Sequence, residues 1–182
     1  MNELSLHILD ICQNSTKANA TLIEIIIVEN TSLNEMIITI KDNGHGMDQN
    51  TLQKVVDPFF TTRTTRNVGL GIALFKLAAE QTNGSLTISS ILNKGTELKA
   101  TLTLNHIDRA PLGKIEDTLL ILLSINKYCD IHYKHINNDQ IYELDTREIK
   151  KVLEVKTIID YDIILWVKNN IKEGIINIHK EV

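Results

Sequence analysis

The sequence predicts an α+β fold, in which a mixed β-sheet has helices packed on one of its faces. Apolar residues recur three or four positions apart over residues 3–18, which is typical of an amphipathic helix. Residues 22–29 and 36–41 are rich in Ile and Val, which favours strands. Helix-like and strand-like segments keep interchanging up to residue 104, so one mixed sheet under a layer of helices is expected.

The first part of the chain is expected to hold eight segments in an α-β-β-α-loop-α-β-β order. In the opening helix, Leu4, Ile8, Ile11 and Ala18 lie along one face. Asp48 is a candidate N-cap for the second helix, and Asn83-Gly84 is a helix C-terminal signal. The expected segments are a helix at 3–18, strands at 22–29 and 36–41, a helix at 48–56, a loop at 57–68, a helix at 70–82, and strands at 85–91 and 96–104.

After Pro111 the pattern changes, and we expect a smaller unit. It should contain a helix at 114–126, a β-hairpin at 129–136 and 140–144, a helix that begins near Asp145 and Glu148, and a final helix at 159–173 that ends at Gly174. The expected division is a ligand-binding domain at 1–105 and a small α/β C-terminal appendage of unknown role at 106–182.

Composition excludes several classes of protein. Hydrophobic residues make up 43% of the chain and charged residues 23%, as in ordinary globular proteins. The net charge of -4 does not favour nucleic-acid binding, so no such partner is expected. Two cysteines outside any CxxC pattern disfavour a zinc ribbon or a disulfide framework. Because no leader-like or membrane-spanning stretch is read, we expect a cytoplasmic protein without a membrane partner.

Polar residues form a stripe on the opening helix. Glu3, His7, Asp10, Asn14 and Lys17 are three or four residues apart and share one face. The simplest interpretation is a solvated face of an amphipathic helix. The alternative is functional, because an amide oxygen can ligate Mg²⁺ and a carboxylate one turn away can orient or deprotonate water.

The segment Asp42-Asn43-Gly44-His45-Gly46-Met47 directly follows a strand. Asp, Asn and Gly are the usual residues of a strand-to-helix turn, so the segment can be purely structural. The functional interpretation needs Gly44 and Gly46 for close backbone approach to a flat ligand, and Asp42 as a buried acceptor for an amine such as that of adenine.

A third segment runs from Asp57 through Arg66 and leads into Gly69-Leu70-Gly71. Glycines at a helix start leave backbone N–H groups free beside the positive end of the helix dipole, which is an anion site. Hydroxyls and arginines just before them suit phosphate. A polar surface loop before a glycine-capped helix is the alternative interpretation.

In their order, these segments resemble the motifs of the GHKL superfamily, which holds gyrase, histidine-kinase and MutL ATPase domains. The segment from Asp10 to Thr21 is similar to the MutL-type N-box, and the segment Asp42 to Met47 is similar to the first glycine box. The segment Asp57 to Arg63 resembles the Glu-Pro-Phe-Phe-Thr-Thr-Lys sequence of histidine kinases. Gly69-Leu70-Gly71-Ile72 resembles the second glycine box, and Gly95-Thr96 the final Gly-Thr.

The resemblance covers residues 4–104 and implies a Bergerat-type α/β sandwich that binds ATP and Mg²⁺ under a mobile lid. By resemblance, Asp42 accepts the adenine amino group, with Thr96 helping through a water, and Asp10 is the catalytic base. Asn14 is the Mg²⁺ ligand. The other residues implied to bind the nucleotide are Gly44, Gly46, Met47, Phe60, Thr62, Arg63, Gly69, Leu70 and Gly71.

Three positions depart from the family pattern. Asp10 stands in place of the Glu general base and reaches one methylene less far, Arg63 stands at a Lys position, and Asn67 replaces a first Gly. The segment between the glycine boxes is short, which implies a small lid.

The chain looks most similar to small stand-alone bacterial ATP-binding proteins. The expected function is therefore an ATPase or phosphotransfer switch that acts on a protein partner, with a homodimer as a further option. The alternatives are a non-catalytic ATP sensor and a protein kinase for Ser, or for a partner's His.

No part in the ligand site is expected for His132, His135 and Trp166. His132 and His135 lie three apart on a strand, so they should face opposite sides and not share a metal, and a surface role is expected for both. Trp166 is expected in the core or at an interface.

Overall fold

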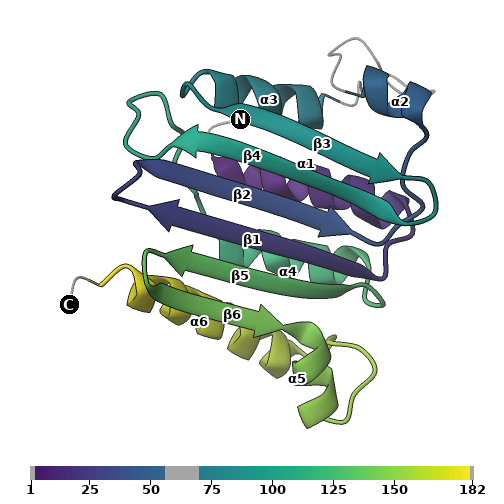
Figure 1. The fold of residues 1–182 in the computed structure, drawn as a ribbon. Coiled ribbons are helices and arrows are strands. Elements are labelled where there is room, and N and C mark those ends of the chain that lie inside the picture. The colour runs from purple at the N-terminus through teal and green to yellow at the C-terminus, as the bar shows by residue number, and fades with distance from the viewer. Residues whose placement is uncertain (1–2, 56–69, 181–182) are drawn as a thin grey trace.

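The computed structural model describes residues 3–55 and 70–180. Figure 1 shows one sheet with helices packed behind it. The elements are α1 (Leu4–Lys17), β1 (Leu22–Asn30), β2 (Glu35–Asp42), α2 (Gln49–Lys54), α3 (Gly71–Glu80), β3 (Ser85–Ile91), β4 (Gly95–Thr103), α4 (Ile115–Ile125), β5 (Asp130–Asn137), β6 (Gln140–Asp145), α5 (Thr146–Val152) and α6 (Tyr161–Ile178).

In the described residues, the sheet has six strands in the order β3-β4-β2-β1-β5-β6. All neighbouring strands are antiparallel except β1 and β5, which are parallel. A parallel neighbour needs a crossover connection, and α4 lies in the connection that leads to β5. The α+β class and the mixed sheet with helices on one face are thus confirmed, and so is the predicted order of helices and strands in the described residues.

The hydrophobic core lies between the sheet and its helices. Alternate residues of the two central strands point into it, and all are at most 2% exposed: Ile23, Ile25, Ile27, Met36, Ile38 and Ile40. The period-two alternation in burial along β1 and β2 shows which face of the sheet the helices cover.

The segment after residue 105 adds strands β5 and β6 to the same sheet and does not form a separate unit beside it. β5 lies along β1, with Ile23 opposite Ile131 and Ile27 opposite His135. Tyr133 and Ile131 belong to the same buried cluster as the first four strands. The division at 105 and 106 stays a prediction about domains, but the sheet itself crosses it.

The segment directly before α4 is hydrogen-bonded to the first turn of α1. The N–H groups of Leu4 and Ser5 donate to the carbonyls of Pro111 and Leu112, at 2.9 and 2.8 Å. These are helix N-terminal donors, for which Glu3 supplies no side-chain cap. Gly113 follows at φ +80, where an added Cβ would lie 2.1 Å from the Glu3 carboxylate. Segment 111–113 therefore fixes the first turn of α1.

The polar stripe of α1 is not wholly solvated, which corrects one interpretation. His7 is only 2% exposed, and its ring stacks on Phe75 of α3 with centroids 5.1 Å apart. Burial, with a smaller contribution from the charged N-terminus, lowers the pKa of His7 from 6.5 to about 4.

Two further expectations about the C-terminal part were wrong. The final helix continues past Gly174 to Ile178, so this glycine lies inside α6. His135 is fully buried rather than at the surface. Trp166 is 55% exposed, so it is not a core residue, and its role at an interface stays a prediction. Among the described residues, no helix has the length and apolar character needed to cross a membrane.

Gly174→Ala should destabilise the protein although alanine is the better helix former. A Cβ at residue 174 would lie 2.1 Å from Cδ2 of Tyr142, whose ring is held by a 2.7 Å hydrogen bond to Asn170. The matched control is Asn169→Ala, at an exposed position of the same helix, which should be neutral or stabilising. In thermal unfolding, the midpoint should fall for Gly174→Ala and stay equal or rise for Asn169→Ala. A Gly174→Ala variant as stable as Asn169→Ala would contradict this packing.

The buried His7 should make the protein sensitive to acid. Its folded-state pKa is lowered, so its contribution to stability is present above about pH 6.5 and is lost as the pH falls toward 4. His7→Phe keeps a stacking ring and removes the titrating group, so urea midpoints should fall less between pH 6.5 and pH 4 than in the parent. His45→Phe, at an exposed position, should keep the parent's slope, and equal slopes in all three proteins would contradict the account.

Candidate functional site

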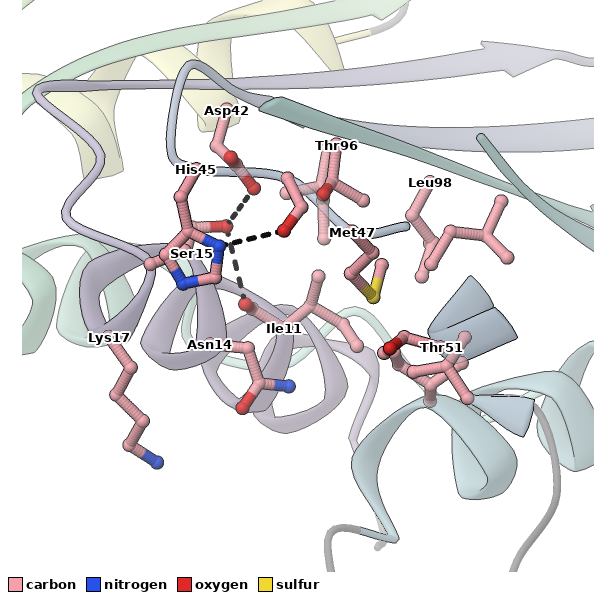
Figure 2. Close-up of a pocket in the computed structure, with 16 residues that line it drawn as sticks. Ile11, Asn14, Ser15, Lys17, Asp42, His45, Met47, Thr51, Thr96 and Leu98 are labelled. Carbon is pink, nitrogen blue, oxygen red and sulfur yellow. Dashed lines mark hydrogen bonds between the residues drawn. The ribbon is translucent and has the colours of Figure 1, made fainter. Parts of the chain in front are cut away.

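A cavity of about 290 Å³ opens between α1, the turn after β2 and the covered face of the sheet (Figure 2). The surface of its walls is largely apolar, and polar side chains lie among the apolar ones. The apolar lining residues are Ile11, Ala18, Ile40, Met47, Val55, Ile72, Ile88 and Leu98, and the others are Asn14, Ser15, Lys17, Asp42, His45, Gly46, Thr51 and Thr96. An apolar cavity with a few converging polar groups is the usual form of a small-molecule site.

Among the described residues that line this cavity, Asp42 is the single acid, and it is 9% exposed. One carboxylate oxygen accepts a 2.6 Å hydrogen bond from the Ser15 hydroxyl of α1. The other accepts the backbone N–H of Gly44 at 2.9 Å. Each oxygen of a carboxylate can accept more than one hydrogen bond, so Asp42 can still accept a proton donor from the cavity.

Thr96 lies directly across from Asp42 in the pairing of β2 and β4. Its hydroxyl is 2.9 Å from the hydroxyl of Ser90 on β3. Ser90 in turn accepts the N–H of Met47 at 2.8 Å. A chain of hydroxyls therefore joins the strand side of the cavity to the turn that carries Met47.

Gly44 and Gly46 are needed by the protein's own packing. A Cβ on Gly44 would lie 2.7 Å from the carbonyl oxygen of Ala18, at the end of α1. Gly46 has φ +63, and a Cβ there would lie 2.2 Å from the carbonyl oxygen of Ile91. The simpler explanation, a tight turn, thus suffices for both glycines, and close approach to a ligand stays a prediction.

Asp10 and Asn14 lie farther along α1, toward its N-terminus. Asn14 is exposed and lines the cavity, and Figure 2 shows it extending from α1 away from Asp42. Asp10 lies against the start of α3, where a Cβ on Gly71 would be 3.1 Å from the Cβ of Asp10. Leu70, the N-cap residue of α3, is 37% exposed and gives no side-chain cap.

The structure thus gathers eight of the residues singled out in the sequence around one cavity and the adjoining helix start: Asp10, Asn14, Asp42, Gly44, Gly46, Met47, Gly71 and Thr96. Leu70 adjoins Gly71. Phe60, Thr62, Arg63 and Gly69 lie outside the described residues, as does the predicted loop at 57–68.

Sequence reasoning gave no binding role to Ser15 and Ser90, although both have detectable signals. Ser15 continues the buried stripe formed by Ile8, Ile11 and Cys12, so a polar residue occupies a core position of α1. Ser90 follows Leu86 and Ile88 on the inward face of β3. A serine in an apolar stripe needs a partner, and here the partners are Asp42 and Thr96.

Curated proteins similar to this chain are sensor proteins. A protein named "Putative sensor protein" from Shewanella frigidimarina (strain NCIMB 400) is 36% identical over 103 residues, which are 56% of this chain and 16% of that protein. "Sensor protein kinase WalK" of Staphylococcus haemolyticus (strain JCSC1435) is 35% identical over 91 residues, 47% of this chain and 15% of the kinase. The chain therefore matches less than a sixth of the length of the first relative, and a similar share of the second.

A solved structure shares the fold. It is described as the crystal structure of the N terminal domain of a DNA repair protein, with a TM-score of 0.54 and 17% sequence identity. The similarity covers 80% of this chain and 52% of the other. It therefore extends beyond residues 4–104, which carry the sequence motifs.

The family model for "Histidine kinase-, DNA gyrase B-, and HSP90-like ATPase" matches residues 2–106. That range contains α1, the glycine turn, α3 and β4, which together surround the cavity. The chain belongs to the family of histidine kinase-, DNA gyrase B- and HSP90-like ATPases.

Proposed function

We propose that the cavity binds the adenine end of ATP and that the Asp42 carboxylate accepts the adenine amino group. The main support is the environment of Asp42. Its buried carboxylate is fixed by two hydrogen-bond donors and still faces an apolar cavity. An exocyclic amine supplies the N–H that such a group needs. The keto oxygen of guanine would face the carboxylate and leave it without a donor.

The phosphates would follow α1 toward its N-terminus. Ser15, Asn14 and Asp10 succeed one another along this helix, and five residues of α-helix span about 7.5 Å. This direction leads from the base site at Asp42 to the start of α3, whose backbone N–H groups suit phosphate oxygens. Arg63 and Gly69, together with Phe60 and Thr62, remain predicted contributors from the sequence.

The side chains at the cavity rim fit a magnesium ion bound together with ATP. Mg²⁺ prefers oxygen ligands and keeps several waters, so one amide oxygen from Asn14 is a suitable protein contribution. When bound, the ion would neutralise charge on the phosphates. Asn14 would hold the ion, and Asp10 would orient or deprotonate a water or an acceptor hydroxyl near it.

The biological role that fits best is a switch in which ATP hydrolysis or phosphotransfer acts on a protein partner, in the cytoplasm. The support is family membership and the similarity to a sensor protein kinase. A homodimer fits the same role. The competing roles are a non-catalytic ATP sensor and a kinase for Ser or for a partner's His, and incubation with γ-labelled ATP, with and without candidate partners, separates them.

Asp42→Asn should weaken ATP binding by about 10–150-fold, equivalent to about 1.5–3 kcal/mol, because a charge-assisted hydrogen bond is lost. The parent should also prefer ATP to GTP in calorimetry. Asp139→Asn, at an exposed hairpin turn, is the matched control and should bind like the parent. Equal affinities for ATP and GTP, or an unaffected Asp42→Asn variant, would refute the assignment of the base site.

Asn14→Ala should remove the Mg²⁺ dependence of ATP binding and leave adenosine binding almost unchanged, because adenosine carries no phosphate. Calorimetric titration with ATP, with and without Mg²⁺, measures the Mg²⁺ dependence, and titration with adenosine measures the adenosine affinity. Asn19→Ala is unsuitable as a control because Asn19 has φ +58, so Gln13→Ala on α1 serves instead. A loss of stability with normal Mg²⁺-ATP affinity would instead assign Asn14 a structural role.

Asp10→Asn should keep ATP affinity and abolish turnover. General-base catalysis contributes about 10²–10⁴-fold, so even partial misplacement of the shorter Asp should leave the parent slow. Asp10→Glu should equal or exceed the parent rate. If Asp10→Asn hydrolyses or transfers phosphate as fast as the parent, Asp10 is not the base, and the sensor role or a kinase that works by positioning alone gains support.

A further inference from the structure

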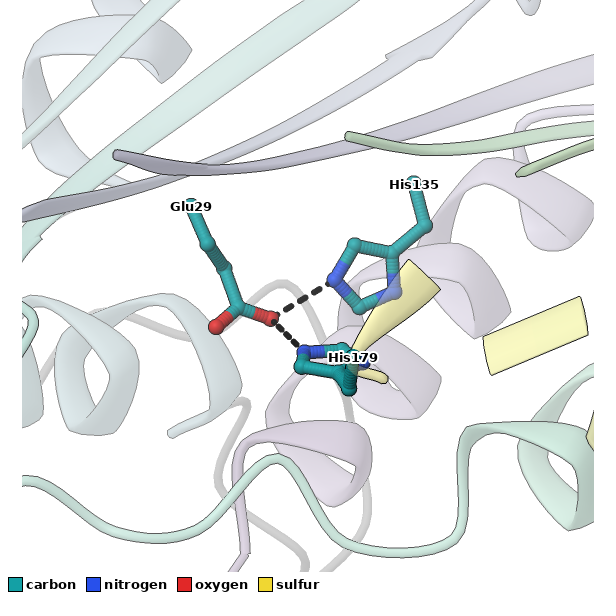
Figure 3. A group of neighbouring side chains, drawn as sticks. All are labelled: Glu29, His135 and His179. Atoms are coloured by element: carbon teal, nitrogen blue, oxygen red, sulfur yellow. Dashed lines mark hydrogen bonds and ion pairs between the residues drawn. The ribbon is translucent and has the colours of Figure 1, made fainter. Parts of the chain in front are cut away.

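Two histidines and a glutamate meet near the end of β1 that is remote from Asp42. Glu29 lies near the end of β1, His135 on β5, and His179 directly after α6 (Figure 3). Their ligand atoms all lie within 4.8 Å of one another. One oxygen of Glu29 is 2.7 Å from Nε2 of His135 and 3.1 Å from Nε2 of His179. The cluster contains none of the residues that line the cavity.

The hydrogen bonds of His179 leave its Nε2 facing a carboxylate. Nδ1 of His179 lies 2.8 Å from the carbonyl oxygen of Ile175, and a carbonyl can only accept, so Nδ1 carries the proton. A neutral His179 would then direct the lone pair of Nε2 at the Glu29 oxygen, which is repulsive. A positive charge must lie between them, as either a second proton on His179 or a metal ion.

The outer contacts of both histidines favour the metal ion. A histidine that binds a metal usually gives its other ring nitrogen to a carbonyl, a carboxylate or another acceptor, which orients the ring. Nδ1 of His179 is hydrogen-bonded to the Ile175 carbonyl, and Nδ1 of His135 is hydrogen-bonded to the Tyr133 hydroxyl at 2.9 Å. In both residues, Nε2 is the nitrogen directed at Glu29.

We propose that Glu29, His135 and His179 form a binding site for a zinc-like divalent transition-metal ion. Two imidazole nitrogens and one carboxylate are a donor set of zinc sites that keep a fourth position for water. His179 is partly exposed, with 38% of its side chain accessible, so water can reach that position. Tetrahedral zinc separates its ligand atoms by about 3.3 Å. Binding therefore requires the 2.7 Å distance between Glu29 and His135 to grow by about 0.6 Å and the 3.1 Å distance between Glu29 and His179 by about 0.2 Å.

The three ligands come from β1, β5 and the end of α6, so a bound ion would fasten the last helix to the sheet. The covalent connection between β5 and His179 is long, and closing it restricts the unfolded chain. The ion would therefore act on the stability of the segment after residue 106, separately from the Mg²⁺ expected with ATP, which prefers oxygen ligands.

The test is calorimetry of metal-free full-length protein with Zn²⁺, without nucleotide. The expected result is one equivalent bound, with release of protons and a higher thermal midpoint. His179→Ala, at an exposed position, should weaken Zn²⁺ binding by at least about 10-fold and abolish the thermal shift. Glu29→Gln, which keeps the side-chain shape and removes the charge, should also weaken binding. Mg²⁺ should give neither effect.

His132→Ala is the matched control. His132 lies on the opposite face of β5, where its two ring nitrogens face different carboxylates, Glu143 and Glu24, so it cannot hold one ion between them. This variant should bind Zn²⁺ like the parent. Absence of Zn²⁺ binding, or equal binding by His179→Ala, would overturn the proposal and assign the cluster to a protonated His179 that holds α6. Loss of binding in His132→Ala would place the metal elsewhere.

Discussion

A buried carboxylate needs compensating donors, and in this fold that need joins α1, the glycine turn and the central strands at one point. Ser15 supplies a donor from the helix and Gly44 supplies one from the turn. The backbone of β4 passes so close that a Cβ on Gly95 would lie 1.9 Å from the Asp42 carbonyl oxygen. The residues around Asp42 are therefore constrained from three sides, and the cavity takes its shape from this packing.

Helix α1 aligns the rest of the candidate site. Its buried face rests on the sheet, and its last turns bring Ser15 to Asp42 and Asn14 to the rim of the cavity. Its first turn is held by the carbonyls of Pro111 and Leu112, which follow the family-matched segment. Thr118 of α4 also donates to the Ser5 carbonyl at 3.2 Å. The segment after residue 106 thus fixes the helix that carries Asp10 and Asn14.

The order of elements could be predicted from the sequence because β1 and β2 are rich in Ile and Val, and because α1 has an amphipathic pattern while α2 and α3 have a start or a stop signal. Asp48, for example, caps α2 as predicted, by accepting the N–H of Thr51. The pairing of β5 with β1 could not be read, because a parallel partner lies far away in the chain and leaves no turn signature. Gly174 lies inside α6 because it packs against Tyr142, and this tertiary contact leaves no local signal to distinguish it from a helix stop.

In the candidate site, too, residues in local motifs could be predicted, whereas contacts between distant segments could not. Asp42, Thr96 and Asn14 were found because they stand in ordered motifs, and the structure places all three around one cavity. The support of Asp42 by Ser15 depends on the packing of α1 over β2, which no local pattern records. The spacing of His7 with Asp10 and Asn14 predicts a solvated helix face, and a surface role was also expected for His135. Tertiary contacts with α3 and with Glu29 of β1 bury the two histidines instead, and no local pattern records these contacts.

The central claim is that Asp42 reads the adenine base, and an experimental structure with Mg²⁺ and a non-hydrolysable ATP analogue tests it most directly. The account predicts the base in the cavity beside Met47 and Leu98, with its amino nitrogen about 2.7–3.2 Å from an oxygen of Asp42. The triphosphate should run along α1 past Asn14 toward Gly71. A base bound outside this cavity, or bound within it with its amino group directed away from Asp42, would contradict the account.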